Sequence, residues 1–225
     1  MADLPALMPE AEINSWLCGV AFAILCHQRA TPALHACVIA VGTRAVAVAG
    51  YSGAGKSTTT VALLQRGHQL VVDDQAIVDP DRLTVSPGFP AVKLWAAAAM
   101  PGYIPDPKDR MRPGVDKFLV RVTDQFASSP VRLAGVVVLR ADPAISEPIL
   151  EPVPWPDSAA LLHGLVHLPD FGLLLDSGRA GLSIMTRIAR SVPVFILMRP
   201  IDMGQMDRIA DSIEGFVQSQ GADRP

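Results

Sequence analysis

The stretch "RAVAVAGYSGAGKSTTTVALLQRGHQLVVDD", residues 44–74, decides the fold. An apolar run of alternating alanine and valine leads into a glycine-rich loop at residues 50–57, and a helix-compatible segment follows the loop. Arg66 and Gly67 give that helix a stop signal, and a second apolar run then ends in two aspartates. This order of strand, loop, helix and strand predicts an α/β fold, in which a mixed sheet with flanking helices carries a P-loop.

The loop "GYSGAGKS" matches the pattern G-x-x-x-x-G-K-[ST], in which each fixed position has a chemical task. Its glycines let successive backbone N–H groups point at phosphate oxygens, and the helix that follows adds the positive end of its dipole. Lys56 would reach the β- and γ-phosphates of ATP, and the Ser57 hydroxyl would bind Mg²⁺. A purely structural glycine turn is the alternative. The residues predicted to contact the nucleotide are Gly50, Ser52, Gly53, Ala54, Gly55, Lys56, Ser57 and Thr58.

Two adjacent carboxylates, Asp73 and Asp74, close the second apolar run. Only one helix and one short strand separate them from Lys56, so we expect the acidic strand to lie close to the glycine-loop strand. Magnesium prefers oxygen ligands, so one carboxylate can hold the metal. The other can accept the proton of an attacking hydroxyl, as phosphoryl transfer to an alcohol requires. The residues leave open which aspartate has which role, and an acidic strand end that starts a turn is the alternative.

The bulk properties restrict the function classes. The 225 residues have a net charge of −3 and are half apolar, which predicts one domain over residues 1–225 without a bulk electrostatic reason to bind nucleic acid. The three cysteines lack C-x-x-C spacing, which predicts reduced thiols. The apolar run at residues 16–26 is too short to cross a membrane, and it follows acidic residues, unlike a secretory signal. These features predict a cytoplasmic protein without a membrane partner.

Further elements are predicted around this unit. The N-terminal extension, residues 1–33, is interpreted as strand-forming because its apolar run resembles a buried strand. A tight turn at Gly42-Thr43 would join two strands into a hairpin. Residues 101–116 contain four prolines and two glycines, which predicts a long flexible loop. Other strands are predicted at 91–95, 131–140 and 193–199, a hairpin turn at 79–81, helices from 157 or 158, over 169–191 and over 203–220, and a frayed end over 221–225.

Residues 34–78 resemble the catalytic domain of the HPr kinase/phosphorylase family. The resemblance comprises a histidine before two hairpin strands, the glycine loop, a helix that ends in R-G-H and an acidic strand, here His35, residues 50–57, residues 66–68 and residues 70–74. It implies a fold shared with phosphoenolpyruvate carboxykinases, in which the acidic strand directly follows the glycine-loop helix. It also implies that Asp73 is the general base toward a substrate serine and that Asp74 is the carboxylate on the metal side.

The same resemblance assigns roles to two histidines and to the assembly. His35 would contact the base or the transferring phosphate, with a core histidine that caps a strand as the alternative. His68 is interpreted as a structural residue at the helix end. Members of the family are often hexameric, and the high apolar fraction of this chain is compatible with a homo-oligomer.

The sequence also departs from that family. HPr kinase has a separate N-terminal domain, whereas only about 33 residues precede His35 here, and its E-I-R-G-x-G signature is absent. Thr58 stands where HPr kinases typically have glutamate. These departures argue against HPr as the substrate and against the pyrophosphate-driven reverse reaction. The segments "PGFPAVKLW" and "DKFLV" instead resemble shorter HPr-kinase-related proteins, some of which belong to lasso-peptide gene clusters and phosphorylate a serine of the precursor.

Several basic residues and one histidine pair are further candidates. Lys93 and Lys117 are predicted to stabilise charge at the transferring phosphoryl group, with solvated strand-edge lysines as the alternative. Lys108, Arg110 and Arg112 could meet an acidic peptide or close over ATP, or belong to a solvated loop. His163 and His167 lie four positions apart but have no third ligand nearby in sequence, so no metal site is predicted there.

The sequence therefore favours an ATP- and Mg²⁺-dependent kinase that phosphorylates a serine or another hydroxyl of a small protein or peptide. Two alternatives stay open: a small-molecule phosphotransferase that uses the same site, and a regulatory protein that binds ATP without transferring phosphate. The second carboxylate favours an enzyme, because a protein that only binds ATP would not need it.

Overall fold

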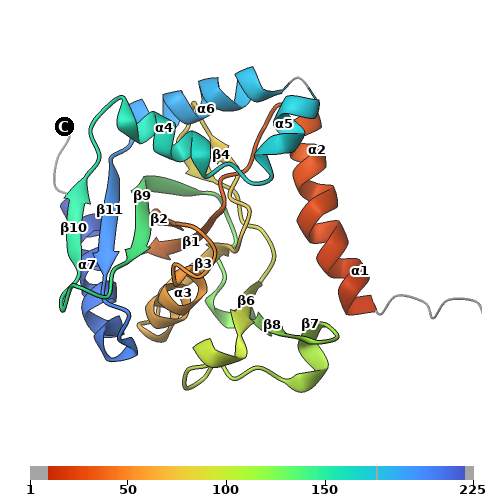
Figure 1. Ribbon diagram of the computed structural model, residues 1–225, viewed down its shortest axis with the longest axis vertical. Coiled ribbons are helices and arrows are strands. Elements are labelled where there is room, and N and C mark those ends of the chain that lie inside the picture. The colour runs from red at the N-terminus through yellow and green to blue at the C-terminus, as the bar shows by residue number, and fades with distance from the viewer. Residues whose placement is uncertain (1–9, 176, 221–225) are drawn as a thin grey trace, which may run out of the picture.

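The computed structural model describes residues 10–175 and 177–220, and it contains a mixed β-sheet with helices against both faces (Figure 1). The strands follow the order β10-β11-β9-β2-β1-β3, and the short hairpin β4–β5 is attached to β9. This arrangement confirms the predicted α/β class, whereas the predicted frayed end lies outside the described residues. The strands are β1 (Ala36–Val41), β2 (Arg44–Ala49), β3 (Gln69–Val72), β4 (Val78–Asp79), β5 (Thr84–Val85), β9 (Val131–Ala141), β10 (Ile149–Pro152) and β11 (Val194–Arg199).

Strand direction brings several segments together at one edge of the sheet. β1 is antiparallel to both β2 and β3, so these two strands run in the same direction and end beside the start of β1. β2 is parallel to β9, and β9 is parallel to β11, so their C-terminal ends lie at the same edge. The predicted turn at Gly42-Thr43 is confirmed, because Val41 pairs with Arg44 across it. The acidic strand β3 lies one strand away from the glycine-loop strand β2, with β1 between them.

Two hydrophobic clusters hold the helices against the sheet. On β2, alanines 45, 47 and 49 face the cluster that includes α4 and α6, whereas valines 46 and 48 face the cluster that includes α3 and α7. In the last helix, the apolar side chains at helical spacing are buried and belong to the core, namely Met206, Ile209, Ile213, Phe216 and Val217. The longer helices after the glycine loop are α3 (Lys56–Gln65), α4 (Asp157–Gly164), α5 (Pro169–Leu174), α6 (Gly178–Ser191) and α7 (Met206–Ser219).

A second, three-stranded sheet lies beside the main one and has the order β6-β8-β7. It corrects the prediction of a flexible loop over residues 101–116, because part of that segment forms an edge strand paired with β8. The strand escaped prediction because its side chains are exposed or half-buried and give no apolar periodicity. The elements of this region are β6 (Ala91–Trp95), β7 (Arg110–Arg112), β8 (Val115–Arg121) and the 3₁₀ turns η2 (Ala96–Ala98), η3 (Pro107–Asp109) and η4 (Thr123–Gln125), and a further turn, η5 (Met203–Gln205), precedes α7.

The N-terminal region forms a helix, so the predicted buried strand at residues 16–26 is wrong. The segments α1 (Glu10–Trp16), the π-helical turn η1 (Leu17–Ala21) and α2 (Phe22–Gln28) follow one another as one rod beside the sheet (Figure 1). In α2 the side chains of Ala23 and Cys26 are buried, whereas Phe22 and Leu25 are apolar and exposed, so the run is apolar on both sides. Periodicity alone cannot separate such a run from a buried strand. Within the described residues, no helix combines the length and the apolar character that a membrane span needs.

Candidate active site

The glycine loop lies between β2 and α3, and its backbone requires glycine at two positions. Gly50 has a φ of +140°, and a Cβ atom there would lie 2.9 Å from the carbonyl oxygen of Leu139. Gly55 has a φ of +97°, and a Cβ atom there would lie 2.7 Å from the guanidinium group of Arg199. A side chain at Gly50 or Gly55 would therefore clash, and the loop backbone packs directly against residues of the neighbouring strands β9 and β11.

Lys56 begins α3 and bends back over the loop. Its ammonium group donates hydrogen bonds to the carbonyl oxygens of Gly50, at 2.7 Å, and of Tyr51, at 3.3 Å. Burial lowers the pKa of Lys56, although nearby acidic groups oppose this shift. The first N–H groups of a helix have no partner within the helix, so the start of α3 is suited to an anion. Of the predicted nucleotide contacts, Ser52, Gly53, Gly55, Lys56, Ser57 and Thr58 line one cavity together with both aspartates.

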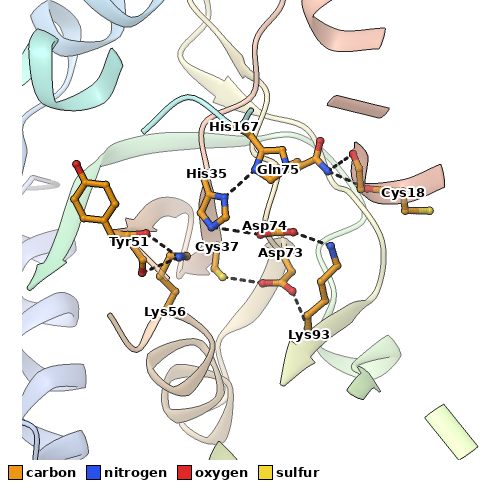
Figure 2. A network of polar contacts seen from close by, with 12 residues as sticks. Cys18, His35, Cys37, Tyr51, Lys56, Asp73, Asp74, Gln75, Lys93 and His167 are labelled. Carbon is orange, nitrogen blue, oxygen red and sulfur yellow. Dashed lines mark hydrogen bonds and ion pairs between the residues drawn. The ribbon is translucent and has the colours of Figure 1, made fainter. Parts of the chain in front are cut away.

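Asp73 is held by two hydrogen bonds at the end of β3 (Figure 2). The Cys37 thiol donates to Oδ1 at 2.7 Å, and the backbone N–H of Lys93 donates to Oδ2 at 2.7 Å. Burial and the neighbouring charge of Asp74 raise the pKa of Asp73, although both hydrogen bonds act in the opposite direction. A carboxylate with a raised pKa binds a proton more readily, which suits a general base.

Asp74 lies beside it in a different electrostatic environment. Its Oδ2 accepts a 2.7 Å hydrogen bond from the Lys93 ammonium, and its Oδ1 lies 3.5 Å from Nε2 of His35. Although burial opposes ionisation, the charge and the hydrogen bond of the Lys93 ammonium hold the pKa of Asp74 below its ordinary value. Asp74 therefore stays a carboxylate, which suits a ligand of a cation. Its φ of +77° is a conformation that aspartate adopts more readily than most side chains.

His35 connects Asp74 to a second histidine, His167, at a distance of 2.8 Å between the two Nδ1 atoms. Burial lowers the pKa of His35 to about 4 although Asp74 raises it, and burial also lowers the pKa of His167. Both rings are therefore neutral at pH 7. If the Nε2–H of His35 points to Asp74, its Nδ1 accepts the Nδ1–H of His167. One ligand atom each from His35, Asp74 and His167 lies within 4.8 Å of the others, an arrangement able to hold a metal ion.

The second sheet supplies the predicted lysines. Lys93 on β6 pairs with Asp74, and Lys117 on β8 lines the same cavity, with its ammonium 5.8 Å from the centroid of the Trp95 ring. The basic side chains predicted from residues 101–116 do not line this cavity. Lys108 pairs with Asp106, and Arg110 pairs with Asp116; neither they nor Arg112 line the cavity.

His68 lies away from this cavity, as predicted for a structural residue. Its Nε2 atom is 2.7 Å from a carboxylate oxygen of Glu214 on α7. Arg66 forms ion pairs with Asp207, Asp211 and Glu214, so the end of α3 is tied to α7 by charge.

Three residues of the site were not assigned to it from the sequence. Cys37 was considered only as a reduced thiol, and His167 only as a partner of His163. Arg199 ends β11, is 8% exposed, and donates from Nε to the Ala54 carbonyl oxygen at 2.7 Å. No carboxylate pairs with Arg199 in the described part of the chain, and burial lowers the pKa of Arg199. The available signal is an arginine that ends the last apolar strand.

Part of the chain is similar in sequence to a known protein. No family model matches the sequence. Over 94 residues the chain is 32% identical to the HPr kinase/phosphorylase of Listeria welshimeri, a match that covers 40% of this chain and 30% of that protein. The Hpr(Ser) kinase/phosphatase structure from Coxiella burnetii is 17% identical with a TM-score of 0.41, over 83% of this chain and 94% of that chain. The Listeria match confirms the resemblance to the HPr kinase/phosphorylase family, over less than a third of that relative's length.

Proposed function

We propose that this chain, which is similar to HPr kinase/phosphorylase over part of its length, is a kinase. It would transfer the γ-phosphate of ATP to the hydroxyl of a serine in a small protein or peptide. One observation carries the proposal: Lys56 of the glycine loop and Asp73, a half-buried carboxylate with a raised pKa, line the same cavity. A phosphate-binding loop and a proton acceptor within one cavity are the two elements that phosphoryl transfer to an alcohol requires.

In the transfer step, the oxygen of the acceptor hydroxyl attacks the γ-phosphorus, and Asp73 accepts the proton of that hydroxyl. The bond between the γ-phosphorus and the bridging oxygen breaks, and ADP leaves with that electron pair. Lys56 and Lys117 supply positive charge in the cavity, while the buried Arg199 fixes the loop through the Ala54 carbonyl oxygen. The contribution of such charges is greatest where water is excluded.

Ser57 and Asp74 are suited to hold Mg²⁺ for this reaction. Both line the cavity, both offer oxygen atoms, and the lowered pKa of Asp74 keeps its carboxylate ionised. The metal ion, when bound, neutralises part of the negative charge on the β- and γ-phosphates. Lys93 already donates to Oδ2 of Asp74, which leaves Oδ1 as the oxygen available to a cation.

The acceptor we propose is a serine of a ribosomally made peptide precursor in the cytoplasm. The segments that resemble the shorter HPr-kinase-related proteins form β6 and β8, and these strands carry Lys93 and Lys117 into the cavity. Cys18, Cys26 and Cys37 are free thiols, which fits a reducing compartment.

The test is intact-mass spectrometry of acceptor peptides and proteins after incubation with the protein, ATP and Mg²⁺. We expect the mass of one phosphate to be added to an acceptor, and we expect Asp73→Asn and Lys56→Ala to abolish the addition. Asp124→Asn, which changes an exposed aspartate outside the cavity, should leave the transfer intact. ATP binding without transfer to any acceptor would favour a regulatory ATP-binding protein. Full transfer by Asp73→Asn would show that Asp73 is not the base.

A further inference from the structure

A second cavity of about 350 Å³ adjoins the first one. It is formed by the start of the glycine loop, residues 50–52, and by residues 164–171, which comprise the end of α4, the connection 165–168 and the start of α5. His35 and Ser52 line both cavities, so the two are neighbours. The volume lies near the lower end of the range for ligand pockets, about 300–1,000 Å³. We call this second space the Leu168 cavity.

The Leu168 cavity differs chemically from the first one. The first cavity is lined by four basic side chains, those of Lys56, Lys93, Lys117 and Arg199, and suits phosphate groups. The residues described as lining the Leu168 cavity include no lysine or arginine. Its wall is mainly apolar, from Tyr51, Leu165, Val166, Leu168, Pro169 and Phe171. This lining suits an apolar group and does not suit a triphosphate.

The Leu168 cavity lies beside one end of the proposed phosphate site. In a P-loop the lysine reaches the β- and γ-phosphates, and the backbone cradles the α- and β-phosphates. The Lys56 ammonium contacts the carbonyl oxygens of Gly50 and Tyr51, and these two residues also line the Leu168 cavity. Figure 2 shows the Tyr51 ring pointing away from Asp73 and Asp74. The Leu168 cavity is therefore next to the end of the phosphate site at which the transferred group lies.

Leu168 has a backbone conformation that leucine does not favour. Its φ is +50° and its ψ is +59°, in the left-handed region that asparagine and glycine adopt more readily. Leu168 also lies outside both hydrophobic core clusters. Neither backbone preference nor packing in these clusters explains a leucine at this position, whereas an apolar contact with a ligand does. Backbone strain of this kind is concentrated at sites that bind ligands.

We infer that the Leu168 cavity binds a large apolar side chain adjacent to the serine that the protein phosphorylates. This inference rests on the proposed kinase function and defines the substrate class of the same site. The serine hydroxyl would lie at the boundary between the cavities, near His35 and Ser52. The neighbouring apolar residue would fill the space between Tyr51 and Leu168.

The test uses short synthetic peptides with one central serine, flanked on either side by leucine, phenylalanine, glycine or aspartate. We expect the wild-type protein to phosphorylate the leucine or phenylalanine peptides with a kcat/KM at least about tenfold above that of the aspartate peptides. Leu168→Asn should reduce this ratio to about one through a higher KM for the apolar peptides, with the KM for ATP unchanged. Asparagine suits the left-handed backbone, so this variant should fold.

Leu83→Asn is the matched control, because Leu83 is also a half-buried leucine, has a φ of +54°, and does not line the cavity. The control should keep the preference for apolar peptides. Equal rates for all peptides, or an unchanged preference in Leu168→Asn, would overturn the inference while leaving the kinase function intact. A raised KM for ATP in Leu168→Asn would overturn it too, because the cavity would then hold the nucleoside. Transfer to no acceptor at all would instead contradict the proposed function.

Discussion

Asp73 and Asp74 are neighbours in the chain but lie in opposite electrostatic environments. Burial and the like charge of Asp74 raise the pKa of Asp73, although the hydrogen bonds from the Cys37 thiol and the Lys93 backbone N–H oppose this shift. Asp74 contacts the Lys93 ammonium, so its pKa is lowered. A pair of carboxyl groups with pKa values shifted apart can divide the roles of base and cation ligand. At the scale of single residues, these environments support the division that the family resemblance implied.

Cys37 is the residue that orients the proposed base. Removal of its S–H donor by Cys37→Ala leaves Oδ1 of Asp73 without a partner, so we expect kcat to fall about tenfold, a fraction of the roughly 10²–10⁴-fold that a general base contributes. The KM for ATP should not change. Because the lost hydrogen bond had lowered the pKa of Asp73, the acidic limb of the pH–rate profile should move to higher pH. Steady-state kinetics over a pH series measures both effects.

Two further variants separate positioning from simple destabilisation. Cys37→Ser keeps a donor at the same place and should restore most of the lost activity. Cys26→Ala removes another buried thiol outside the site and should leave the profile unchanged. If Cys37→Ala and Cys26→Ala behave alike, Cys37 has no role in orienting the base.

At the scale of elements, the N-terminal helix is joined to the site by its π-helical turn. The wider turn from Leu17 to Ala21 has backbone carbonyl groups directed at Gln75, whose side-chain amide donates to Cys18 at 3.0 Å and to Gly19 at 2.9 Å. Gln75 follows the acidic pair directly and is buried. The helix is thereby connected to the loop that carries both carboxylates.

We expect Gln75→Leu to destabilise the fold by about 1–3 kcal/mol, because two hydrogen bonds to the carbonyl oxygens of the π-helical turn are lost, at about 0.5–1.5 kcal/mol each, while side-chain volume is nearly kept. The free energy of unfolding from denaturant titration measures the effect. Gln65→Leu is the matched control, since it removes a single exposed hydrogen bond to the Pro101 carbonyl oxygen. That variant should change the free energy of unfolding by less than about 0.5 kcal/mol. Equal losses in the two variants would mean that Gln75 does not support the π-helical turn.

At the scale of the whole molecule, the half-buried histidines His35 and His167 make stability depend on pH. Folding lowers the pKa of His35 from 6.5 to about 4, so at intermediate pH the unfolded chain binds more protons than the folded one. Stability is therefore fully present above about pH 6.5 and decreases as the pH falls toward about 4. His167 has a pKa shifted in the same direction and adds to this dependence. The lowered pKa of Asp74 removes further stability at still lower pH.

We expect the melting temperature, measured in the presence of a chelator, to fall as the pH is lowered from 6.5 to 4, because partial burial disfavours protonated imidazoles at His35 and His167. His35→Gln should flatten this part of the curve, since glutamine does not titrate. His163→Gln should leave it unchanged, because His163 contacts neither His35 nor Asp74 in the polar network. A curve that is equally steep in wild type and His35→Gln would mean that the acid sensitivity has another origin.

The sequence alone determined the unit around the glycine loop. The alternation of alanine and valine, the loop pattern, the stop at Arg66-Gly67 and the two aspartates predicted β2, the loop, α3 and β3, and the structure contains each of them. These signals are local, because propensity, glycine spacing and helix termination act over a few residues. Lys93 and Lys117 could be named as candidates from the sequence. Because the signals are local, the positions of these two lysines in the cavity could not be derived.

The tertiary structure decided which distant residues meet at the site. His35 and His167 are 132 positions apart, and Arg199 and Ala54 are 145 apart, so no local pattern connects them. Arg199 meets Ala54 because the ends of β2 and β11 lie at one edge of the sheet. His167 meets His35 because Val166, just before His167, pairs with Leu34, just before β1. Tertiary packing also decided that residues 16–26 form a helix, since a short apolar run can bury one side as a helix or both faces as a strand.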